Sequence, residues 1–346
     1  MIHKICLVAG GTGGHIVPAI AFGQWLKTKH PLIDIDFISG SRKIEKEIYY
    51  AHKISATICP ISGSPYGVKN FFVKILRWKE ILFSVFYALY YINKKNPDVI
   101  LLFGGYVSLP FLLAGKFKKK KIFMHEQNVK RGKVSRLASR LGVEILDSWN
   151  ANGSSQCICV GMPLRKLEHV QRSVALEKLG LSKISPGSCV LGVLGGSLGS
   201  PELVEYISHI SQDPFFKSWE FVVLGEKSGY ICQNVHIVES SWNPSLLYSI
   251  LDLALTRAGG STLAELVSYR IPALILPLKK SSEGHQVENA KYFSELGLGM
   301  VSEDDIVEVK DSLKLIFKKN KNKEIDFEKC VDHTLSCKKI YDLVIK

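Results

Sequence analysis

The sequence lacks a long hydrophobic run. No apolar stretch reaches the ~18 residues that a membrane-spanning helix needs, although 46% of the 346 residues are hydrophobic. The first apolar segment, Ile5 to Val8, begins almost at once, which leaves no room for a signal peptide. The composition therefore predicts a soluble, cytoplasmic protein that is long enough for two domains.

Paired cysteines are also missing. The eight cysteines are scattered, none forms a Cys-x-x-Cys pair, and several lie in strand-like segments, so we expect buried thiols rather than a metal site. The triplet Asp34-Ile35-Asp36 has the spacing of a metal–nucleotide signature. It falls inside an expected strand with both carboxylates on one face, and we interpret it as structural. We expect no metal and no other cofactor.

The second half of the chain has no excess of basic over acidic residues. The whole sequence has 45 Lys and Arg against 32 Asp and Glu, and residues 1–163 hold 23 of the basic and 9 of the acidic residues. A basic surface on one half favours an anionic membrane or nucleic acid as partner. Nucleic acid is the weaker choice, because the sequence contains no recognised nucleic-acid-binding motif.

Strand-like and helix-like segments alternate along the chain. In the first half, a long helix is expected over 70–95, and strands are expected at 5–8, 34–38, 57–59, 99–103 and 122–124. The alternation restarts after residue 188, with strands at 190–194, 221–224, 235–238, 253–256 and 273–276. This order predicts an α/β fold with parallel sheets. We expect two Rossmann-like domains, 1–163 and 164–326, facing each other across a cleft, and a C-terminal helix over 327–346 that packs back towards the first domain.

A glycine-rich turn follows the first strand. Four of the five residues from Gly10 to Gly14 are glycine, and His15 comes next. Such a turn can present free N–H groups and the positive end of a helix dipole to a phosphate or pyrophosphate. It is neither a dinucleotide fingerprint, because Ile16 replaces the third glycine, nor a Walker loop. The second half repeats the pattern, since strand 190–194 runs into the glycine turn Gly195 to Ser200.

Seven short motifs are spread over nearly the whole chain: GGTGGH, FGGYVS, HEQN, GMPLR, GGSLG, RAGGSTLAE and HQxxNA. In this order they resemble the MurG family of cell-wall N-acetylglucosaminyltransferases in the GT-B superfamily. The resemblance implies metal-independent, inverting transfer of GlcNAc from UDP-GlcNAc to the C4 hydroxyl of a MurNAc-pentapeptide carried on undecaprenyl pyrophosphate. It also implies a peripheral enzyme on the cytoplasmic face of the plasma membrane.

The resemblance places most donor contacts in the second half. Small and hydroxyl residues open a helix after Arg257, so its first amides suit a diphosphate, and Glu265 would accept both ribose hydroxyls. A solvated helix carboxylate is the alternative for Glu265. Gln286 would contact the GlcNAc hydroxyls, and Asn289 shares its helix face. The expected donor ligands are Thr12, Gly13, Gly14, Asn128, Arg165, Ser197, Ser261, Thr262, Leu263, Glu265, Gln286 and Asn289.

His15 is the expected catalytic residue, because an imidazole that is near-neutral at cellular pH can serve as the base for the attacking hydroxyl. It could equally donate a hydrogen bond to the acceptor pyrophosphate, and His125 is a rival base. The expected ligands of the acceptor pyrophosphate are Gly10, Gly11, Gly104, Gly105 and Tyr106.

Aromatic and basic residues are mixed over Phe71 to Lys79, and a dense lysine strip follows at 116–121. Together they suit an anionic membrane surface. The alternative is an ordinary helix that buries one face and solvates its lysines. The expected membrane residues are Phe71, Phe72, Trp78, Lys118, Lys119, Lys120 and Lys121.

The sequence departs from the family pattern at three places. Met162 and Ser135 stand where asparagine is usual, and the segment Glu239 to Asn243, which should hold the uracil, lacks the usual aromatic and acidic pattern. Three alternative functions are another GT-B transferase of a lipid acceptor, a UDP-GlcNAc epimerase, and a non-catalytic membrane-bound sugar-nucleotide sensor.

Overall fold

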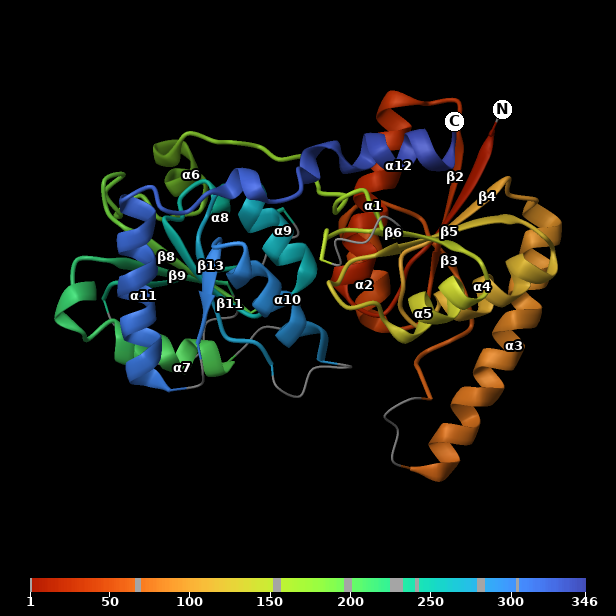
Figure 1. Ribbon diagram of the computed structural model, residues 1–346, viewed down its shortest axis with the longest axis horizontal. Helices are drawn as coiled ribbons and strands as arrows, with labels where there is room; N and C mark the ends of the chain where they lie inside the picture. Colours follow the sequence, from red (N-terminus) through yellow and green to blue (C-terminus); the bar gives the residue numbers. More distant parts are fainter. Residues whose placement is uncertain are drawn as a thin grey trace. The chain divides into compact units, whose positions relative to one another are not determined.

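The computed structural model describes residues 2–65, 70–151, 157–195, 201–224, 233–239, 243–278, 284–302 and 305–346 (Figure 1). The chain divides into two compact units. Unit 1 contains residues 1–165 and 331–346, and unit 2 contains residues 166–330. Each unit contains one parallel sheet, so the expected α/β class with two such domains is confirmed.

Unit 1 contains a seven-stranded sheet of order β3-β2-β1-β4-β5-β6-β7, in which all neighbouring strands are parallel. The strands are β1 (Lys4–Val8), β2 (Asp34–Ser39), β3 (Thr57–Ile58), β4 (Val99–Leu102), β5 (Lys121–Glu126), β6 (Glu144–Asp147) and β7 (Ile158–Cys159). The helices are α1 (Gly13–Lys29), α2 (Lys43–Ala51), α3 (Phe71–Lys95), α4 (Ser108–Phe117), α5 (Lys133–Arg140) and α12 (Ser336–Val344), the last preceded by the short 3-10 helix His333–Leu335.

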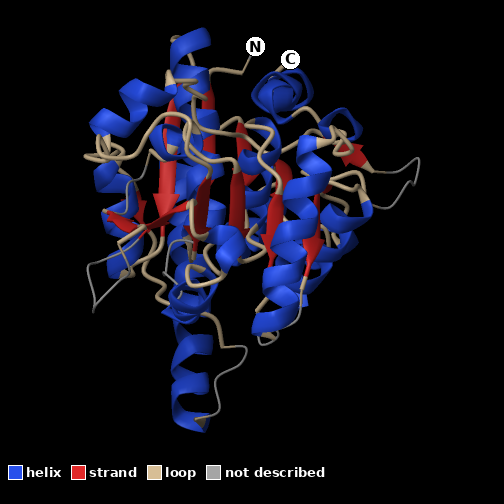
Figure 2. Ribbon diagram, turned by 90° about the vertical axis from the view of Figure 1, so that its left-hand side faces the viewer, coloured by secondary structure: helices blue, strands red, loops and turns tan. Residues whose placement is uncertain are grey.

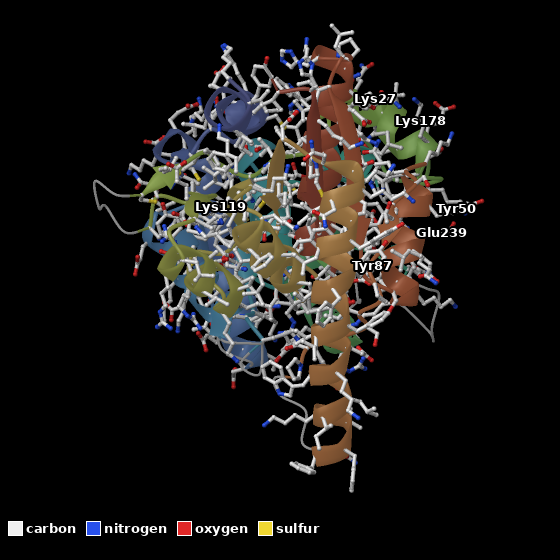
Figure 3. All side chains as sticks on the ribbon, turned by 90° about the vertical axis from the view of Figure 1, so that its right-hand side faces the viewer. Lys27, Tyr50, Tyr87, Lys119, Lys178 and Glu239 are labelled. Atoms are coloured by element: carbon white, nitrogen blue, oxygen red, sulfur yellow. The ribbon has the colours of Figure 1, made fainter. Side chains whose placement is uncertain are left out.

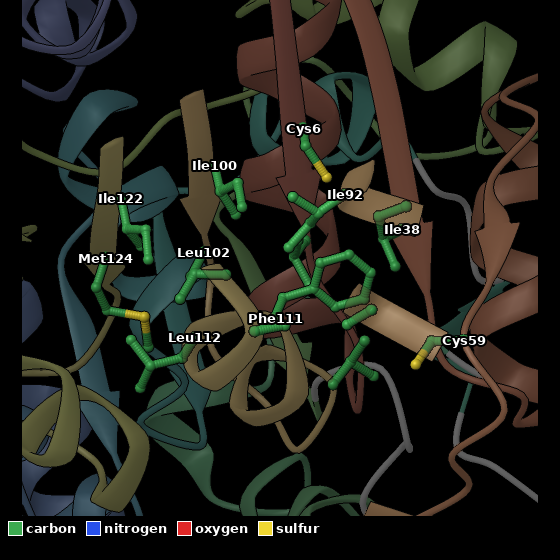
Figure 4. Packing of buried hydrophobic residues seen from close by; sticks show 14 of the residues in the cluster. Cys6, Ile38, Cys59, Ile92, Ile100, Leu102, Phe111, Leu112, Ile122 and Met124 are labelled. Atoms are coloured by element: carbon green, nitrogen blue, oxygen red, sulfur yellow. The ribbon is translucent and has the colours of Figure 1, made fainter. Parts of the chain in front are cut away.

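Alternation along the buried strands of unit 1 sends side chains to both faces of the sheet. On one face, Cys6, Ile100 and Leu102 pack with Ile92 of α3 and Phe111 of α4 (Figure 4). On the other face, α1 approaches so closely that a Cβ at Gly23 would overlap the ring of Phe37 and touch Leu7. Strands covered on both faces are expected to be continuously apolar, as β4 is throughout and β1 is from Ile5 onward.

Unit 2 contains a six-stranded sheet of order β10-β9-β8-β11-β12-β13, again parallel, and Figure 2 shows strands flanked by helices. Its strands are β8 (Val190–Leu194), β9 (Glu220–Leu224), β10 (Val235–Val238), β11 (Leu253–Thr256), β12 (Ala273–Ile275) and β13 (Gly299–Val301). Its helices are α6 (Arg172–Lys178), α7 (Pro201–Ile210), α8 (Ser245–Tyr248), α9 (Gly260–Ser268), α10 (His285–Glu295) and α11 (Ile306–Lys321), with 3-10 turns at Pro214–Phe216 and Phe327–Lys329.

Short ion pairs explain the Asp-x-Asp triplet. Asp34 and Asp36 lie in β2, as expected, and their Oδ2 atoms lie 2.6 Å and 3.1 Å from Nζ of Lys4 on the neighbouring strand. The hydrogen bond to Asp34 raises the pKa of Lys4. Tyr91 of α3 donates to Asp36 at 2.6 Å, so this carboxylate also holds a helix on the sheet.

Three further expectations concern the cysteines, the membrane and the last helix. Burial is correct for Cys6, Cys59 and Cys337, but wrong for Cys157, Cys159, Cys189 and Cys330, which are half-exposed. Among the described residues, no helix is long and apolar enough to cross a membrane. The last helix, α12, packs on α1 within unit 1, where the rings of Tyr341 and His30 stack with centroids 3.8 Å apart.

Candidate active site

The three polar motifs of unit 1 meet at one edge of its sheet. Strands β1, β4 and β5 are adjacent and parallel, so their carboxyl ends bring together Gly10 to His15, Gly104 to Tyr106 and His125 to Asn128. The chain reverses its order between β1 and β4, and open α/β sheets bind ligands at such a switch point.

The first two of these motifs form one structure, which we call the glycine cradle (Gly10 to Gly14 with Gly104 to Tyr106). A Cβ at Gly105 would overlap the carbonyl oxygen of Gly10, and a Cβ at Gly10 would overlap Val107. Gly11, Gly104 and Gly105 also have positive φ, at 100°, 91° and 74°. The two turns therefore need glycine, both for their backbone conformation and for their close approach.

A buried carboxylate lies beneath the glycine cradle. Glu45 of α2 is fully buried, accepts from the N–H of Gly11, and accepts from the hydroxyl of Tyr106 at 2.7 Å. Its second oxygen accepts from the N–H of Arg42 at 2.9 Å. The expectation that the cradle amides are free is therefore wrong for Gly11, because Glu45 already uses that donor. Motif matching missed Glu45, since an acidic residue in a first helical turn is ordinary capping.

Helix α1 begins directly at the cradle. Thr12 precedes it with an extended backbone, and within residues 2–65 the helix start has neither a side-chain cap bond nor an acidic residue in its first turn. The positive end of the helix dipole is thus not neutralised by its own first turn. Thr12 is exposed, Gly13 is buried, and Gly14 and His15 are half-buried at this end.

His15 is connected to the interior of unit 1 by hydrogen bonds. Its Nδ1 lies 2.7 Å from Oε1 of Gln127, whose Nε2 lies 2.9 Å from Nδ1 of His125. His125 is fully buried, and its Nε2 lies 2.9 Å from the carbonyl oxygen of Gly161. Burial lowers the pKa of His125 to about 4. Because both its ring nitrogens are hydrogen-bonded within the protein, the rival base is positioned as an interior residue.

Glu126 organises the loop that follows β5. One carboxylate oxygen accepts from the backbone and side-chain amides of Asn128, at 3.0 Å and 3.1 Å. The other accepts from the N–H of Gly132 at 2.9 Å and from the hydroxyl of Ser135 at 2.6 Å. Ser135, one of the departures from the family pattern, is therefore a buried support for this loop.

In unit 2 the strands β8 and β11 are also adjacent and parallel, so their carboxyl ends lie side by side. The turn after β11 enters α9 through Gly259 and Gly260. Nδ2 of Asn289 donates to the carbonyl oxygen of Ala258 at 3.0 Å, so α10 holds this turn from the side. Oε1 of Gln286 accepts from the N–H of Leu278 at 3.0 Å. Ser197, predicted as a donor ligand, lies outside the described residues.

The first turns of α9 place the other predicted donor residues. Ser261 and Thr262 are half-buried at the helix start, whereas Leu263 is buried and its N–H donates to the carbonyl of Gly259 at 3.0 Å. Glu265 is only 5% exposed and accepts from the hydroxyl of Tyr248 at 2.8 Å. The solvated-carboxylate alternative for Glu265 is therefore wrong. The sequence contained no local signal for Tyr248, which comes from another helix.

The segment around Met162 belongs to unit 1. Met162 is fully buried, and its N–H donates to Nδ1 of His333 at 3.0 Å. Arg165 lies half-buried three residues further on, at the end of the first stretch of the unit. At the position where asparagine is usual, the sulfur of Met162 lies 3.8 Å from the hydroxyl of Ser148.

The two parts of the expected membrane surface lie at opposite ends of α3. Phe71, Phe72 and Trp78 are exposed, by 68%, 76% and 45%, in the first turns of the helix, which extend beyond the rest of unit 1 (Figure 3). Nζ of Lys120 instead donates to Asn96, the residue that caps the other end of α3, at 2.6 Å, and Lys121 donates to the carbonyl of Val344. About 27 Å of helix separates Trp78 from Asn96, so the aromatic and lysine-rich parts are two separate patches of unit 1.

Comparison with known proteins identifies two domains. Residues 5–145 match the glycosyltransferase family 28 N-terminal domain, and residues 190–334 match the glycosyltransferase family 28 C-terminal domain. A UDP-N-acetylglucosamine--N-acetylmuramyl-(pentapeptide) pyrophosphoryl-undecaprenol N-acetylglucosamine transferase of Fusobacterium nucleatum is 30% identical over 343 residues, covering 93% of this chain and 91% of that protein. The protein of the same name from Thermosipho africanus is 29% identical and covers 99% of both chains.

Solved structures agree with the fold. The crystal structure of Acinetobacter baumannii MurG gives a TM-score of 0.63 at 19% identity and covers 97% of this chain and 94% of that one. UDP-GlcNAc 2-epimerase from Neisseria meningitidis, bound to UDP-GlcNAc, also gives 0.63, at 16% identity, and covers 98% of both chains. At these identities the structural likeness shows a shared fold and does not distinguish the two activities.

Proposed function

The chain belongs to glycosyltransferase family 28, and we propose that it transfers GlcNAc from UDP-GlcNAc to the C4 hydroxyl of undecaprenyl-pyrophosphoryl-MurNAc-pentapeptide, with inversion. The observation that carries this proposal is the full-length similarity to relatives named for that reaction, up to 30% identical over 93% of the chain. The two glycine-rich sheet edges, one in each unit, supply sites for the two phosphate-bearing substrates.

Unit 1 would hold the acceptor. The amides of Gly10, Gly104 and Gly105 in the glycine cradle and the start of α1 would bind the acceptor pyrophosphate. Gly11 and Tyr106, whose donors are bonded to Glu45, would shape the cradle around it. His15 would take the proton of the C4 hydroxyl as that oxygen attacks the anomeric carbon of GlcNAc. His125 supports His15 from the interior, because its ring nitrogens are already hydrogen-bonded to Gln127 and Gly161.

Unit 2 would hold most of the donor. The amino end of α9, with Ser261 and Thr262, would face the diphosphate, and its dipole would stabilise the departing UDP without a metal ion. The buried carboxylate of Glu265 would accept hydrogen bonds from the ribose hydroxyls. Oε1 of Gln286 is held by Leu278, so its amide nitrogen would donate to the sugar. Asn289 would act through the Ala258 turn that it holds.

The exposed first turns of α3 would dock on the cytoplasmic face of the membrane that carries the lipid acceptor. Phe71, Phe72 and Trp78 lie there beside the exposed Lys74 and Lys79, a combination that suits an anionic bilayer surface. The segment before α3 follows β3, so this end of the helix lies towards the same sheet edge as the glycine cradle.

The direct test is incubation of the purified protein with UDP-GlcNAc and lipid-linked MurNAc-pentapeptide, with and without EDTA. We expect the lipid-linked disaccharide and UDP in both samples. Absence of product beside an active control enzyme would contradict the proposal, and loss of product in EDTA alone would contradict metal independence. Because epimerases share the fold, a sample without acceptor should be analysed too: conversion of UDP-GlcNAc to another sugar would indicate epimerase activity.

A further inference from the structure

His15, Gln127 and His125 form a line of hydrogen bonds, and a backbone carbonyl determines which ring nitrogen of His125 carries a proton. Nε2 of His125 lies 2.9 Å from the carbonyl oxygen of Gly161. A carbonyl oxygen can only accept a hydrogen bond, so His125 carries a proton on Nε2. Burial keeps the ring neutral at cellular pH, and a neutral imidazole has one N–H. Nδ1 of His125 is therefore an acceptor.

A second backbone carbonyl orients the amide of Gln127. Its Nε2 lies 3.0 Å from the carbonyl oxygen of His125 and 2.9 Å from Nδ1 of the same residue. Both partners are acceptors, and an amide nitrogen has two protons to donate. Only the NH₂ group of Gln127 can occupy this position, so its Oε1 must face His15.

The orientation of Gln127 determines the proton position on His15. Oε1 only accepts, and it lies 2.7 Å from Nδ1 of His15, so Nδ1 carries the proton. The neutral ring then has its lone pair at Nε2. We propose that Gln127 is a positioning residue that holds neutral His15 in the Nδ1–H tautomer and so presents Nε2 as the base to the acceptor hydroxyl. This inference rests on the proposed function.

The proposal distinguishes the two roles that the residue type allows for His15. A neutral His15 in this tautomer has no Nε2 proton to donate to a pyrophosphate, whereas it can accept the C4 hydroxyl proton there. That proton moves to Nε2 as the hydroxyl oxygen bonds to the anomeric carbon, and the electron pair of the broken C1–O bond leaves with UDP. The resulting imidazolium keeps its bond to Gln127, which stabilises the charge formed in the transition state.

Other groups around the ring are the same in all the variants below. Tyr106 lies in the turn before α4, and a Cβ at Gly11 would be 4.0 Å from the Tyr106 ring and 3.8 Å from the His15 ring. The hydroxyl of Tyr106 is bonded to Glu45 of α2, and Arg42 lies over its ring with its guanidinium carbon 4.7 Å from the centroid. His125 of β5 is linked to the His15 ring by hydrogen bonds through Gln127. A change in titration after substitution of Gln127 therefore reports on the bond to His15.

The test compares two replacements of Gln127 with a matched control. Gln127→Met keeps the side-chain length but removes the acceptor, and we expect kcat to fall by about 10- to 100-fold with both KM values nearly unchanged. Gln127→Glu keeps an acceptor for Nδ1 of His15 but places its second oxygen against the two acceptors of His125. We therefore expect kcat to fall less than in Gln127→Met, and the acid limb of its pH profile should move to higher pH because a carboxylate beside an imidazole favours the protonated ring. Ser84→Ala, which removes the 3.2 Å bond from a buried hydroxyl of α3 to the carbonyl of Pro60, should leave kcat unchanged.

A direct reading of the tautomer comes from the ¹⁵N chemical shifts of the His15 ring at a pH where the ring is neutral. The native protein should show the proton on Nδ1, and Gln127→Met should show a mixture of tautomers. This spectrum needs no turnover, so it tests the positioning role even if the native protein makes no product. Native kcat in Gln127→Met, an Nε2–H ring in the native protein, or equal loss of kcat in the methionine and glutamate variants would overturn the proposal.

Discussion

Unit 1 and unit 2 both have a glycine turn after a buried parallel strand. Different side chains hold the turn in each unit. In unit 1 the turn lies on the buried carboxylate of Glu45 and beside the hydrogen-bonded chain that begins at His15. In unit 2 it is held by the side-chain amide of Asn289 and lies one helical turn from Glu265, which pairs with Tyr248. The shared fold therefore determines where the site lies, while side chains from neighbouring elements determine its chemistry.

The surfaces of the two halves differ as well. The excess of basic over acidic residues lies within residues 1–163. The same half has the run of exposed apolar residues in the first turns of α3. This uneven distribution supports the proposal that unit 1 meets the lipid-bearing acceptor and the membrane, while unit 2 binds most of the soluble nucleotide. The four predictions below test that division.

The largest effect is expected for His15→Ala, which removes the proposed base from unit 1. We expect kcat to fall by about 10²- to 10⁴-fold, while the Kd for UDP-GlcNAc, measured by calorimetry, stays the same. A parallel fall in affinity for UDP-GlcNAc would contradict the separation of the acceptor in unit 1 from the donor in unit 2. If the acceptor KM rose while kcat survived, His15 would be a ligand of the pyrophosphate instead.

Next in size is the membrane contact of unit 1. Replacing Phe71 and Trp78 by serine should weaken binding to anionic vesicles by about two to four orders of magnitude at low and high salt, because each aromatic side chain contributes roughly 1.5–3 kcal/mol on burial. The matched variant neutralises Lys118, Lys119, Lys120 and Lys121. It should weaken binding much less, because this strip lies at the far end of α3, well beyond a Debye length of about 8 Å.

Turnover of a short, water-soluble acceptor should survive in both membrane variants, since neither changes the glycine cradle. A quadruple lysine variant that binds vesicles as poorly as the aromatic one would show that the strip, and not the first turns of α3, faces the membrane.

A smaller loss is expected for Glu265→Gln in unit 2. Charge-assisted hydrogen bonds to the ribose are worth about 1.5–3 kcal/mol, so the Kd for UDP-GlcNAc should rise by about 10- to 100-fold with little change in acceptor KM. Tyr248→Phe is the control, because it removes one bond to Glu265 but keeps the carboxylate, and its effect should be several-fold at most. An unchanged donor Kd in Glu265→Gln would refute the assignment.

The last prediction concerns acid stability, and it belongs to unit 1. Burial lowers the pKa of His125 to about 4 and that of His333 to about 3, against about 6.5 in the unfolded chain. The unfolded chain therefore binds more protons below pH 6.5, and stability present above that pH is lost as the pH falls towards 4. Urea unfolding should show a loss of about 2 kcal/mol for each ring between pH 7 and pH 5. His333→Gln should remove about half of this pH dependence, and a variant that keeps it all would contradict the assignment.

Much of the fold could be predicted from local pattern. Continuous apolar runs ending in glycine turns are typical of parallel strands that enter helices, and β1, β4, β8 and β11 all lie where this pattern indicated. Strands β6 and β13 were not predicted. They are four and three residues long, too short for a periodic signal, and they exist because they pair with β5 and β12.

The site was only partly predictable. The positions of the glycine turns follow from the sequence, because their backbone conformation demands glycine wherever the chain folds in this way. The carboxylate beneath Gly11 does not follow, since Glu45 is an ordinary capping residue in the sequence and becomes part of the site only because α2 packs under the turn.

The two-domain α/β plan, the family, and the residue types at the carboxyl ends of the central strands all follow from the order of residues along the chain. Only the tertiary structure decided which nitrogen of His15 is protonated, and that the aromatic and lysine-rich segments lie at opposite ends of α3. The physical reason is that these properties depend on partners distant in the chain. His15 and Gln127 are 112 residues apart, and they meet only because β1, β4 and β5 lie side by side in one parallel sheet.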